Sequence, residues 1–193
     1  MRSWKSLFLI IVLGPLYLVA FAVVHEIGHT VLARLFGDYG STFYLAQIDP
    51  DGRGLCLGCN ITDHAKLSPL GNLAVSLGGL LFTQVMALIA LGMMRFTLSH
   101  TLRNWLLTPI ALGFAFLDVP VQVIQGLLYN IERHTWPTGV DLMDAMILIS
   151  RGTGAPTVIL KMILAILAAA YLYLIWHAYK RVSVFANKLS FFL

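Results

Sequence analysis

Two histidines stand four residues apart near the start of the chain, in the stretch His25-Glu26-Ile27-Gly28-His29. Residues i and i+4 of a helix lie on one face, one above the other. His25 and His29 on a helix can therefore hold one divalent ion between their rings, and this spacing is typical of Zn²⁺ sites. The adjacent Glu26 can then take a proton from a metal-activated water, which predicts hydrolytic chemistry.

The motif is unusual for a chain of this composition. The sequence has six histidines and only two glutamates, and random shuffling would give roughly 0.002 matches to the pattern. Apolar residues precede it, and an ionisable side chain at membrane depth costs about 2.5–3.5 kcal/mol on insertion scales. We therefore interpret His25, Glu26 and His29 as functional residues.

The composition indicates a membrane protein. Of the 193 residues, 59% are apolar and 11% are charged, whereas soluble domains have about 25% charged residues. An ordinary soluble protein, a disordered chain and a disulfide scaffold are thereby excluded. The net charge of +4 does not predict a nucleic-acid partner, because the cations are sparse and flank apolar runs, as they do beside membrane spans.

Four apolar stretches are long enough to cross a bilayer, at about 7–36, 67–94, 105–128 and 157–179. Each meets the ~20 residues that a helix needs to span a hydrocarbon core, and helices satisfy every backbone group in lipid. The first stretch has features of a signal peptide, but cleavage would remove the motif, so we interpret it as an uncleaved span. The chain is predicted to be a single all-α polytopic membrane domain over 1–193, with the lipid bilayer as a partner.

The loop 37–66 is too polar to span. Residues 42–48 are rich in β-formers, Asp49-Pro50-Asp51-Gly52 is a turn signal, and 54–61 can return as a second strand. We predict a small β-hairpin at the membrane surface. Cys56 and Cys59 lie too far apart on an extended strand for a disulfide, unless the chain turns at Gly58.

Basic residues distribute unevenly between the two predicted sides of the membrane. Four spans place both termini on one side, and that side also carries more of the lysines and arginines: Arg2, Lys5, Arg95, Arg103, Lys180, Arg181 and Lys188, against Arg53, Lys66, Arg133 and Arg151. The positive-inside tendency therefore favours cytoplasmic termini.

A motif of this kind inside an N-terminal hydrophobic helix resembles the site-2 protease family of intramembrane zinc metalloproteases, and is most similar to the small bacterial branch of peptidases in that family. Gly28 matches the glycine that members carry at the fourth motif position. The predicted hairpin and the small-residue stretch 76–84 also have counterparts in the family. The resemblance covers about 7–156.

The resemblance implies a zinc-dependent endopeptidase of the bacterial inner membrane. Its substrates would be membrane-embedded or membrane-anchored proteins, cut by metal-activated water with Glu26 as general base. A non-catalytic membrane protein that retains the protease fold is an alternative, and a metal-binding transporter is another. The intact Glu26 disfavours a non-catalytic protein. The polar residues gather near one depth instead of being distributed along several spans, which disfavours a transporter.

A catalytic zinc site takes three protein ligands, and two aspartates compete for the third place beside His25 and His29. Asp118 lies in the third span at a depth that roughly matches the motif. Asp141 lies in the stretch 138–156, which resembles the Ser-Asp-Ala…Thr-Gly-x-Pro signature of the small branch. The chain lacks the Asn-Pro…Asp-Gly stretch of many members. Depth favours Asp118 and resemblance favours Asp141, which we prefer.

Two glutamines on the third span, Gln122 and Gln125, add to the polar residues of this region. Each can bond a neighbouring helix or a substrate backbone, and the contact between helices is the expected one.

Overall fold

A computed structural model of the chain describes residues 2–48, 55–97, 99–128 and 140–189. The helices are α1 (Arg2–Leu35), α2 (Pro69–Met94), α3 (His100–Leu102), α4 (Phe114–Leu128), α5 (Asp141–Thr153) and α6 (Thr157–Leu189). Strands β1 (Thr42–Ile48) and β2 (Leu55–Ile61) follow α1, and short helical turns occupy η1 (His64–Lys66), η2 (Arg103–Leu107) and η3 (Pro109–Gly113).

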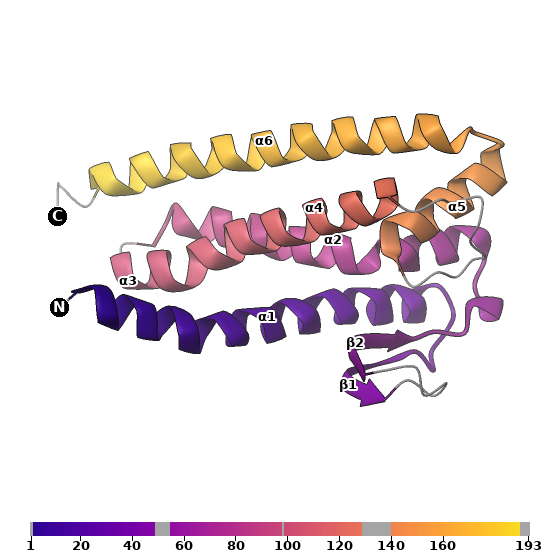
Figure 1. Cartoon of the computed structure of the whole chain (residues 1–193), viewed down its shortest axis with the longest axis horizontal. Helices are drawn as coiled ribbons and strands as arrows, with labels where there is room; N and C mark the ends of the chain where they lie inside the picture. The colour runs from indigo at the N-terminus through magenta and orange to yellow at the C-terminus, as the bar shows by residue number, and fades with distance from the viewer. Residues whose placement is uncertain (1, 49–54, 98, 129–139, 190–193) are drawn as a thin grey trace.

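Four helical segments are long and apolar enough to cross a membrane: Ile11–Leu35, Pro69–Met94, Arg103–Leu128 and Thr157–Ser183. They agree with the predicted spans within a few residues, so the all-α polytopic membrane fold is confirmed. The third segment passes from α3 through the wider π-helical turns η2 and η3 into α4. The N-terminal end of α1 and the C-terminal end of α6 lie at the same end of the bundle (Figure 1).

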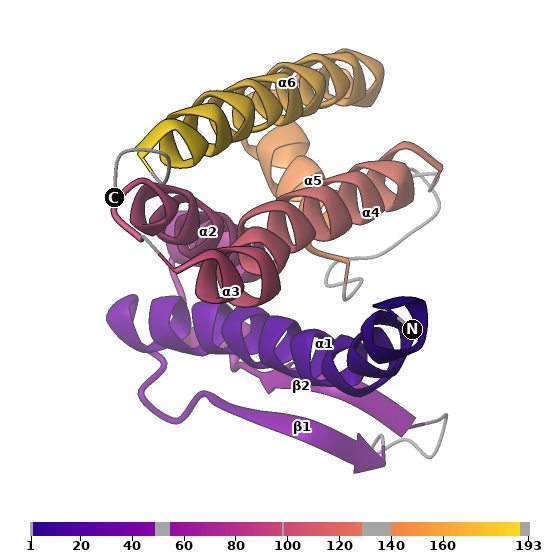
Figure 2. The same ribbon diagram turned by 90° about the vertical axis from the view of Figure 1, so that its left-hand side faces the viewer.

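The elements stack in layers across the bundle. The hairpin covers one side of α1, α2 and α4 lie on the other side, and α6 forms the far layer (Figure 2). The short helix α5 lies between α2, α4 and α6. It begins inside the bundle beside α2 and α4 and runs outward to the start of α6 (Figure 1). An inward-starting helix of this kind was not among the sequence predictions.

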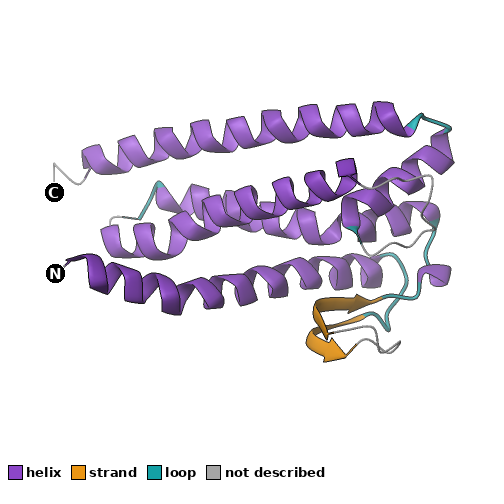
Figure 3. Ribbon diagram, in the orientation of Figure 1, coloured by secondary structure: helices purple, strands orange, loops and turns teal. Residues whose placement is uncertain are grey.

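The predicted hairpin is confirmed. β1 and β2 pair antiparallel, with Thr42 opposite Ile61 and Ile48 opposite Leu55, and the expected turn at 49–52 lies outside the described residues. The hairpin folds back alongside the last third of α1 instead of extending beyond its end (Figure 3). Gly58 has a φ of +79°, in the left-handed region that favours glycine, and the adjacent Cys59 is disulfide-bonded.

Glycines allow α1 and α2 to approach backbone to backbone. A Cβ on Gly78 would lie 2.8 Å from the carbonyl oxygen of Gly28, and a Cβ on Gly28 would overlap the carbonyl of Gly78. Small residues at such a crossing let helices pack closely in a membrane, where the hydrophobic effect does not drive their association. The contact fixes the depth of the His25–His29 turn relative to α2.

Candidate metal centre

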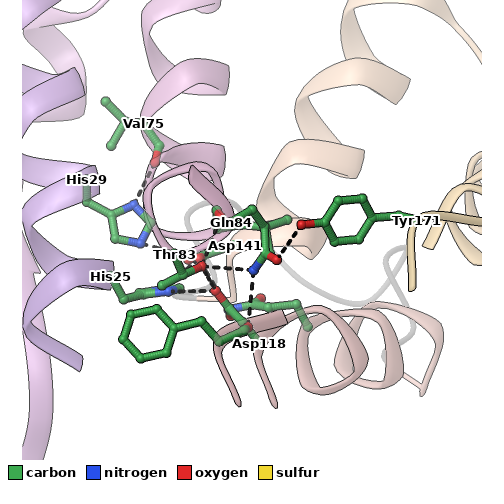
Figure 4. Close-up of polar contacts among 11 residues, drawn as sticks. His25, His29, Val75, Thr83, Gln84, Asp118, Asp141 and Tyr171 are labelled. Atoms are coloured by element: carbon green, nitrogen blue, oxygen red, sulfur yellow. Dashed lines mark hydrogen bonds and ion pairs between the residues drawn. The ribbon is translucent and has the colours of Figure 1, made fainter. Parts of the chain in front are cut away.

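Three side chains from two distant parts of the chain converge at one point. One donor atom each from His25, His29 and Asp141 lies within 4.8 Å of the others. Asp141 Oδ2 is 2.9 Å from His25 Nε2 and 3.3 Å from His29 Nε2. Figure 4 shows both imidazole rings and the Asp141 carboxylate facing one another. The structure therefore brings together the two motif histidines and the preferred third residue.

The two histidines are held by contacts on their Nδ1 atoms. His29 Nδ1 donates to the carbonyl oxygen of Val75 at 2.6 Å, and His25 Nδ1 lies 3.3 Å from Asp118 Oδ2. Metal-binding histidines almost always bond the ring nitrogen that does not face the metal, which fixes the tautomer and the ring orientation. In both rings the remaining nitrogen is Nε2, the atom that faces Asp141.

Asp141 enters the site at the first turn of α5. Gln122 Nε2 on α4 donates to Asp141 Oδ2 at 3.2 Å, which is the contact between helices that the sequence predicted for Gln122. Burial by itself raises the pKa of the Asp141 carboxyl, but hydrogen bonds from His25 and His29 outweigh burial and hold the pKa at about 2. Asp141 is therefore an ionised carboxylate at neutral pH, as a metal ligand must be.

The donor types and the two separations that involve Asp141 are compatible with a zinc ion. Ligand atoms about 2.0–2.1 Å from a tetrahedral zinc lie about 3.3 Å from each other, close to the 2.9 and 3.3 Å separations between Asp141 and the histidines. The side of the site formed by α2 is kept open by Gly79. A Cβ there would overlap His25 Nε2 and lie 2.5 Å from His29 Nε2, so any other residue would occupy the space in front of both donor atoms.

Asp118 reaches the same depth as the motif, as the sequence predicted, but it contacts the opposite side of His25. Its carboxylate approaches Nδ1, whereas Asp141 approaches Nε2. The hydroxyl of Thr83 donates to the same Asp118 oxygen. The geometry therefore places Asp118 behind a candidate ligand instead of among the three converging donor atoms.

A cavity of about 650 Å³ opens onto the three converging side chains. Glu26 lines it, and so do polar residues from the hairpin and from η1, among them Asn60 and His64. The Glu26 carboxylate lies beside Gly58 of β2, where a Cβ would come within 3.1 Å of Oε1. Glu26 is thus held between the candidate metal centre and the hairpin, within a space that can admit a second molecule.

The cavity has an apolar side formed by α1 and α4. Leu18 and Phe21 of α1 line it opposite Leu117 and Val121 of α4. Leu18 is 59% exposed and Val121 is 51% exposed, so these residues belong both to the cavity and to the outer apolar surface of the bundle. The apolar side of the cavity is therefore continuous with the exposed apolar surface of α1 and α4.

A polar cluster ties the hairpin to the motif helix. Asn60 Nδ2 on β2 donates to Thr30 Oγ1 at 2.7 Å, and Thr30 Oγ1 in turn donates to the backbone oxygen of Glu26 at 3.0 Å. Asn60 Nδ2 also lies within hydrogen-bond distance of Ser41 Oγ and the Thr42 carbonyl. These contacts set β2 against the turn of α1 that carries Glu26.

Sequence reasoning missed several residues that support the site. Thr83 and Gln84 were included only as part of a small-residue stretch, and Tyr171 was not singled out. The signal that could have found Thr83 is a polar residue one helical turn after Gly79, on the face of α2 that the glycines turn toward α1. No comparable signal marks Tyr171, because its partner Gln84 is 87 residues away.

Comparison with known proteins adds no relative. The chain matches no family model, and neither the curated proteins nor the solved structures include one that is similar to it. The part of the chain that the structure describes thus has four helices long and apolar enough to cross a membrane, as in an integral membrane protein, and a candidate three-residue metal centre beside a cavity.

Proposed function

We propose that the protein is an intramembrane zinc-dependent endopeptidase of the site-2 protease type. The observation that carries this proposal is the convergence of His25 Nε2, His29 Nε2 and Asp141 Oδ2 in one cavity that Glu26 also lines. A metal site with a purely structural role has no need of an additional carboxylate in a cavity large enough for a ligand. Three protein ligands with one position left open are the arrangement of catalytic zinc sites.

Each residue has a definite part in peptide hydrolysis. His25, His29 and Asp141 would hold Zn²⁺, which when bound supplies Lewis-acid polarisation of the scissile carbonyl and activation of a water molecule. Glu26 takes one proton from the attacking water. As the C–N bond breaks, Glu26 delivers that proton to the leaving nitrogen, so that a carboxylic acid and an amine are released and Glu26 is again ionised.

The substrates that suit this cavity are membrane-embedded or membrane-anchored proteins. The apolar side between Leu18 and Val121 admits a hydrophobic segment directly from the bilayer. A helical segment has its peptide bonds shielded, so it must be extended before cleavage. The hairpin beside Glu26 offers a strand along which an extended segment can pair by β-augmentation.

The proposed topology has both termini in the cytoplasm of a bacterial cell, with the protein in the inner membrane. Its support is the excess of lysine and arginine at the end of the bundle that holds the termini. The disulfide at Cys59 agrees with this orientation, because it would put the hairpin on the non-cytoplasmic, oxidising side.

The experiment is a cleavage assay with Glu26→Gln. The full chain is reconstituted in lipid vesicles with a set of synthetic transmembrane peptides, and new peptide termini are identified by mass spectrometry. Glutamine keeps the size of the side chain but cannot take a proton, so we expect cleavage to fall by about 10²–10⁴-fold while bound zinc stays stoichiometric.

Three outcomes would defeat the proposal. Unchanged cleavage by Glu26→Gln would remove the general base. Wild-type protein that holds no zinc, or that holds zinc and cuts no peptide while retaining its fold, would favour a non-catalytic membrane protein or a transporter.

A further inference from the structure

A chain of polar side chains, half-buried at Tyr171 and Gln84 and buried at Thr83 and Asp118, runs from α6 across α2 to the back of His25 (Figure 4). The Tyr171 hydroxyl donates to Gln84 Oε1 at 2.9 Å. Gln84 Nε2 lies 3.1 Å from Thr83 Oγ1 and also donates to the carbonyl of Phe114 at 3.2 Å. Thr83 Oγ1 then bonds Asp118 Oδ2, and the same oxygen lies 3.3 Å from His25 Nδ1.

The direction of the hydrogen bonds follows from the chemistry of the groups. Carboxylate oxygens accept hydrogen bonds, and Asp118 Oδ2 lies within reach of two groups that can donate, the Thr83 hydroxyl and His25 Nδ1. The Thr83 hydroxyl has one hydrogen and also lies 2.9 Å from the Leu80 carbonyl, but the charged acceptor forms the stronger bond. His25 Nδ1 therefore donates to Asp118, so that Nε2 can give up its own hydrogen and offer a lone pair to a metal ion on the side of Asp141.

The buried end of this chain of polar side chains has a free-energy cost, because its groups are removed from water. Thr83 is fully buried and Asp118 is 3% exposed, within segments long enough to span the membrane. Polar and ionisable residues at that depth are expensive and usually functional. Loss of the Thr83 hydroxyl would therefore take a hydrogen bond from the buried Asp118 carboxylate.

We infer that Asp118 is a positioning residue, and that Thr83, Gln84 and Tyr171 support it, so that His25 presents Nε2 to the metal in a fixed tautomer and orientation. The inference rests on the metal site of the proposed function. It also assigns a role to α6, which reaches the site only through the Tyr171 hydroxyl in this chain of contacts. His29 differs, since a backbone carbonyl holds it and no side-chain substitution removes that acceptor.

The test is the zinc affinity of the full chain, measured by competition with a chromophoric chelator in the absence of any substrate. Loss of an outer partner of a metal-binding histidine typically weakens metal binding about 10–100-fold, and we expect Asp118→Ala to fall in that range, with Asp118→Asn between it and wild type. Thr83→Val removes one hydrogen bond and should cost about fivefold. Thr83→Ser, which restores the hydroxyl, should recover wild-type affinity.

Tyr171→Phe removes only the last hydroxyl and should weaken zinc binding less than Thr83→Val. Its matched control is Tyr173→Phe, which removes a hydroxyl from an exposed residue two positions along α6 and should leave the affinity unchanged. The visible spectrum of the Co²⁺-loaded protein supplies a second measurement. We expect it to shift in Asp118→Asn, because the environment of a ligand has changed, and to stay the same in Tyr173→Phe.

The outcomes separate this inference from the proposed function. If the wild type binds no zinc, the proposed function fails and this inference with it. If the wild type binds zinc and the Asp118 and Thr83 variants bind it within twofold as tightly, only the positioning role is overturned. The positioning role is also overturned if the variants lose zinc affinity only in proportion to their loss of thermal stability in the metal-free protein, and if Thr83→Ser does not recover affinity.

Discussion

The two regions that supply the candidate ligands are built in different ways. His25 and His29 lie on the long helix α1, where it crosses α2 through the backbone contact of Gly28 with Gly78. Asp141 lies at the start of the short helix α5, whose contacts are made by side chains. Met143, Met146 and Ile147 form its buried face and pack against Leu160 and Leu164 of α6.

This difference has a mechanical consequence. Two backbones in contact can shift little without a clash, since protein interiors are close-packed. Methionine is unbranched and adapts to irregular gaps, so the face of α5 can adjust by small amounts. We therefore expect α1 and α2 to form a preformed two-histidine half of the site and α5 to be the half that adjusts if an ion binds.

The largest effect is expected at Asp141. Asp141→Ala removes a proposed ligand and should weaken zinc binding by more than the ~10–100-fold that outer partners cost, with cleavage lost in parallel. Asp141→Glu should retain weaker binding, because α5 can shift to accept a longer carboxylate. His25→Glu on the rigid helix should not retain it. Equal losses in the two glutamate variants, measured by chelator competition, would contradict the contrast.

The second-largest loss of zinc affinity is expected for Gly79→Ala. The added Cβ would overlap His25 Nε2 and crowd His29 Nε2, and the rigid crossing cannot move away, so zinc affinity should fall about 10–100-fold. Gly92→Ala is the matched control on the same helix, because nothing lies within 4 Å of its Cβ position. It should leave zinc binding unchanged and favour the helix by about 0.5–1 kcal/mol. If Gly79→Ala binds zinc as tightly as the wild type, the crossing of α1 and α2 is able to move and is not rigid.

Removal of zinc should loosen α5 selectively. We expect amide hydrogen exchange in the first turn of α5, at 141–144, to rise when a chelator strips the ion, because a carboxylate that no longer binds metal releases that turn. Amides of α1 and α2 around Gly28 and Gly78 should exchange at an unchanged rate. A rise of similar size in all three helices would mean that neither half of the site is preformed.

The smallest effect is expected at Gln122. Its Nε2 atom holds the Asp141 carboxylate, and Gln122→Leu should weaken zinc binding about fivefold, the value of one hydrogen bond. Gln125 lines the same cavity about one helical turn further along α4, so Gln125→Leu is the control. If the two variants behave alike in the chelator competition, Gln122 does not orient Asp141.

Much of the fold was predictable because a bilayer restricts the choices. Four stretches of about 20 apolar residues can only be helices in lipid, and their bounds agree with the structure to within a few residues. The hairpin was predictable from β-formers on either side of a turn signal. Its position alongside α1 was not, because it depends on the contacts of Asn60 with Thr30 and of Gly58 with Glu26.

The site was only partly predictable from the sequence, because one part of it depends on local helix geometry and the other on contacts between distant helices. The motif histidines could be paired from the sequence, because helical geometry alone puts residues 25 and 29 on one face. The choice between Asp118 and Asp141 stayed open, since matching depth in the membrane says nothing about which ring nitrogen a carboxylate approaches. The contact of Asp118 with Nδ1 and of Asp141 with Nε2 required coordinates.

The apolar spans, the hairpin and the local pairing of His25 with His29 follow from the residue order alone, because they depend on interactions between residues close in the chain and on the solvent around it. The inward start of α5, the approach of Asp141 to both Nε2 atoms and the hydrogen-bonded chain from Tyr171 to His25 became visible only in the folded bundle. Contacts between residues tens of positions apart depend on how the helices pack, and helix packing is a property of the whole bundle.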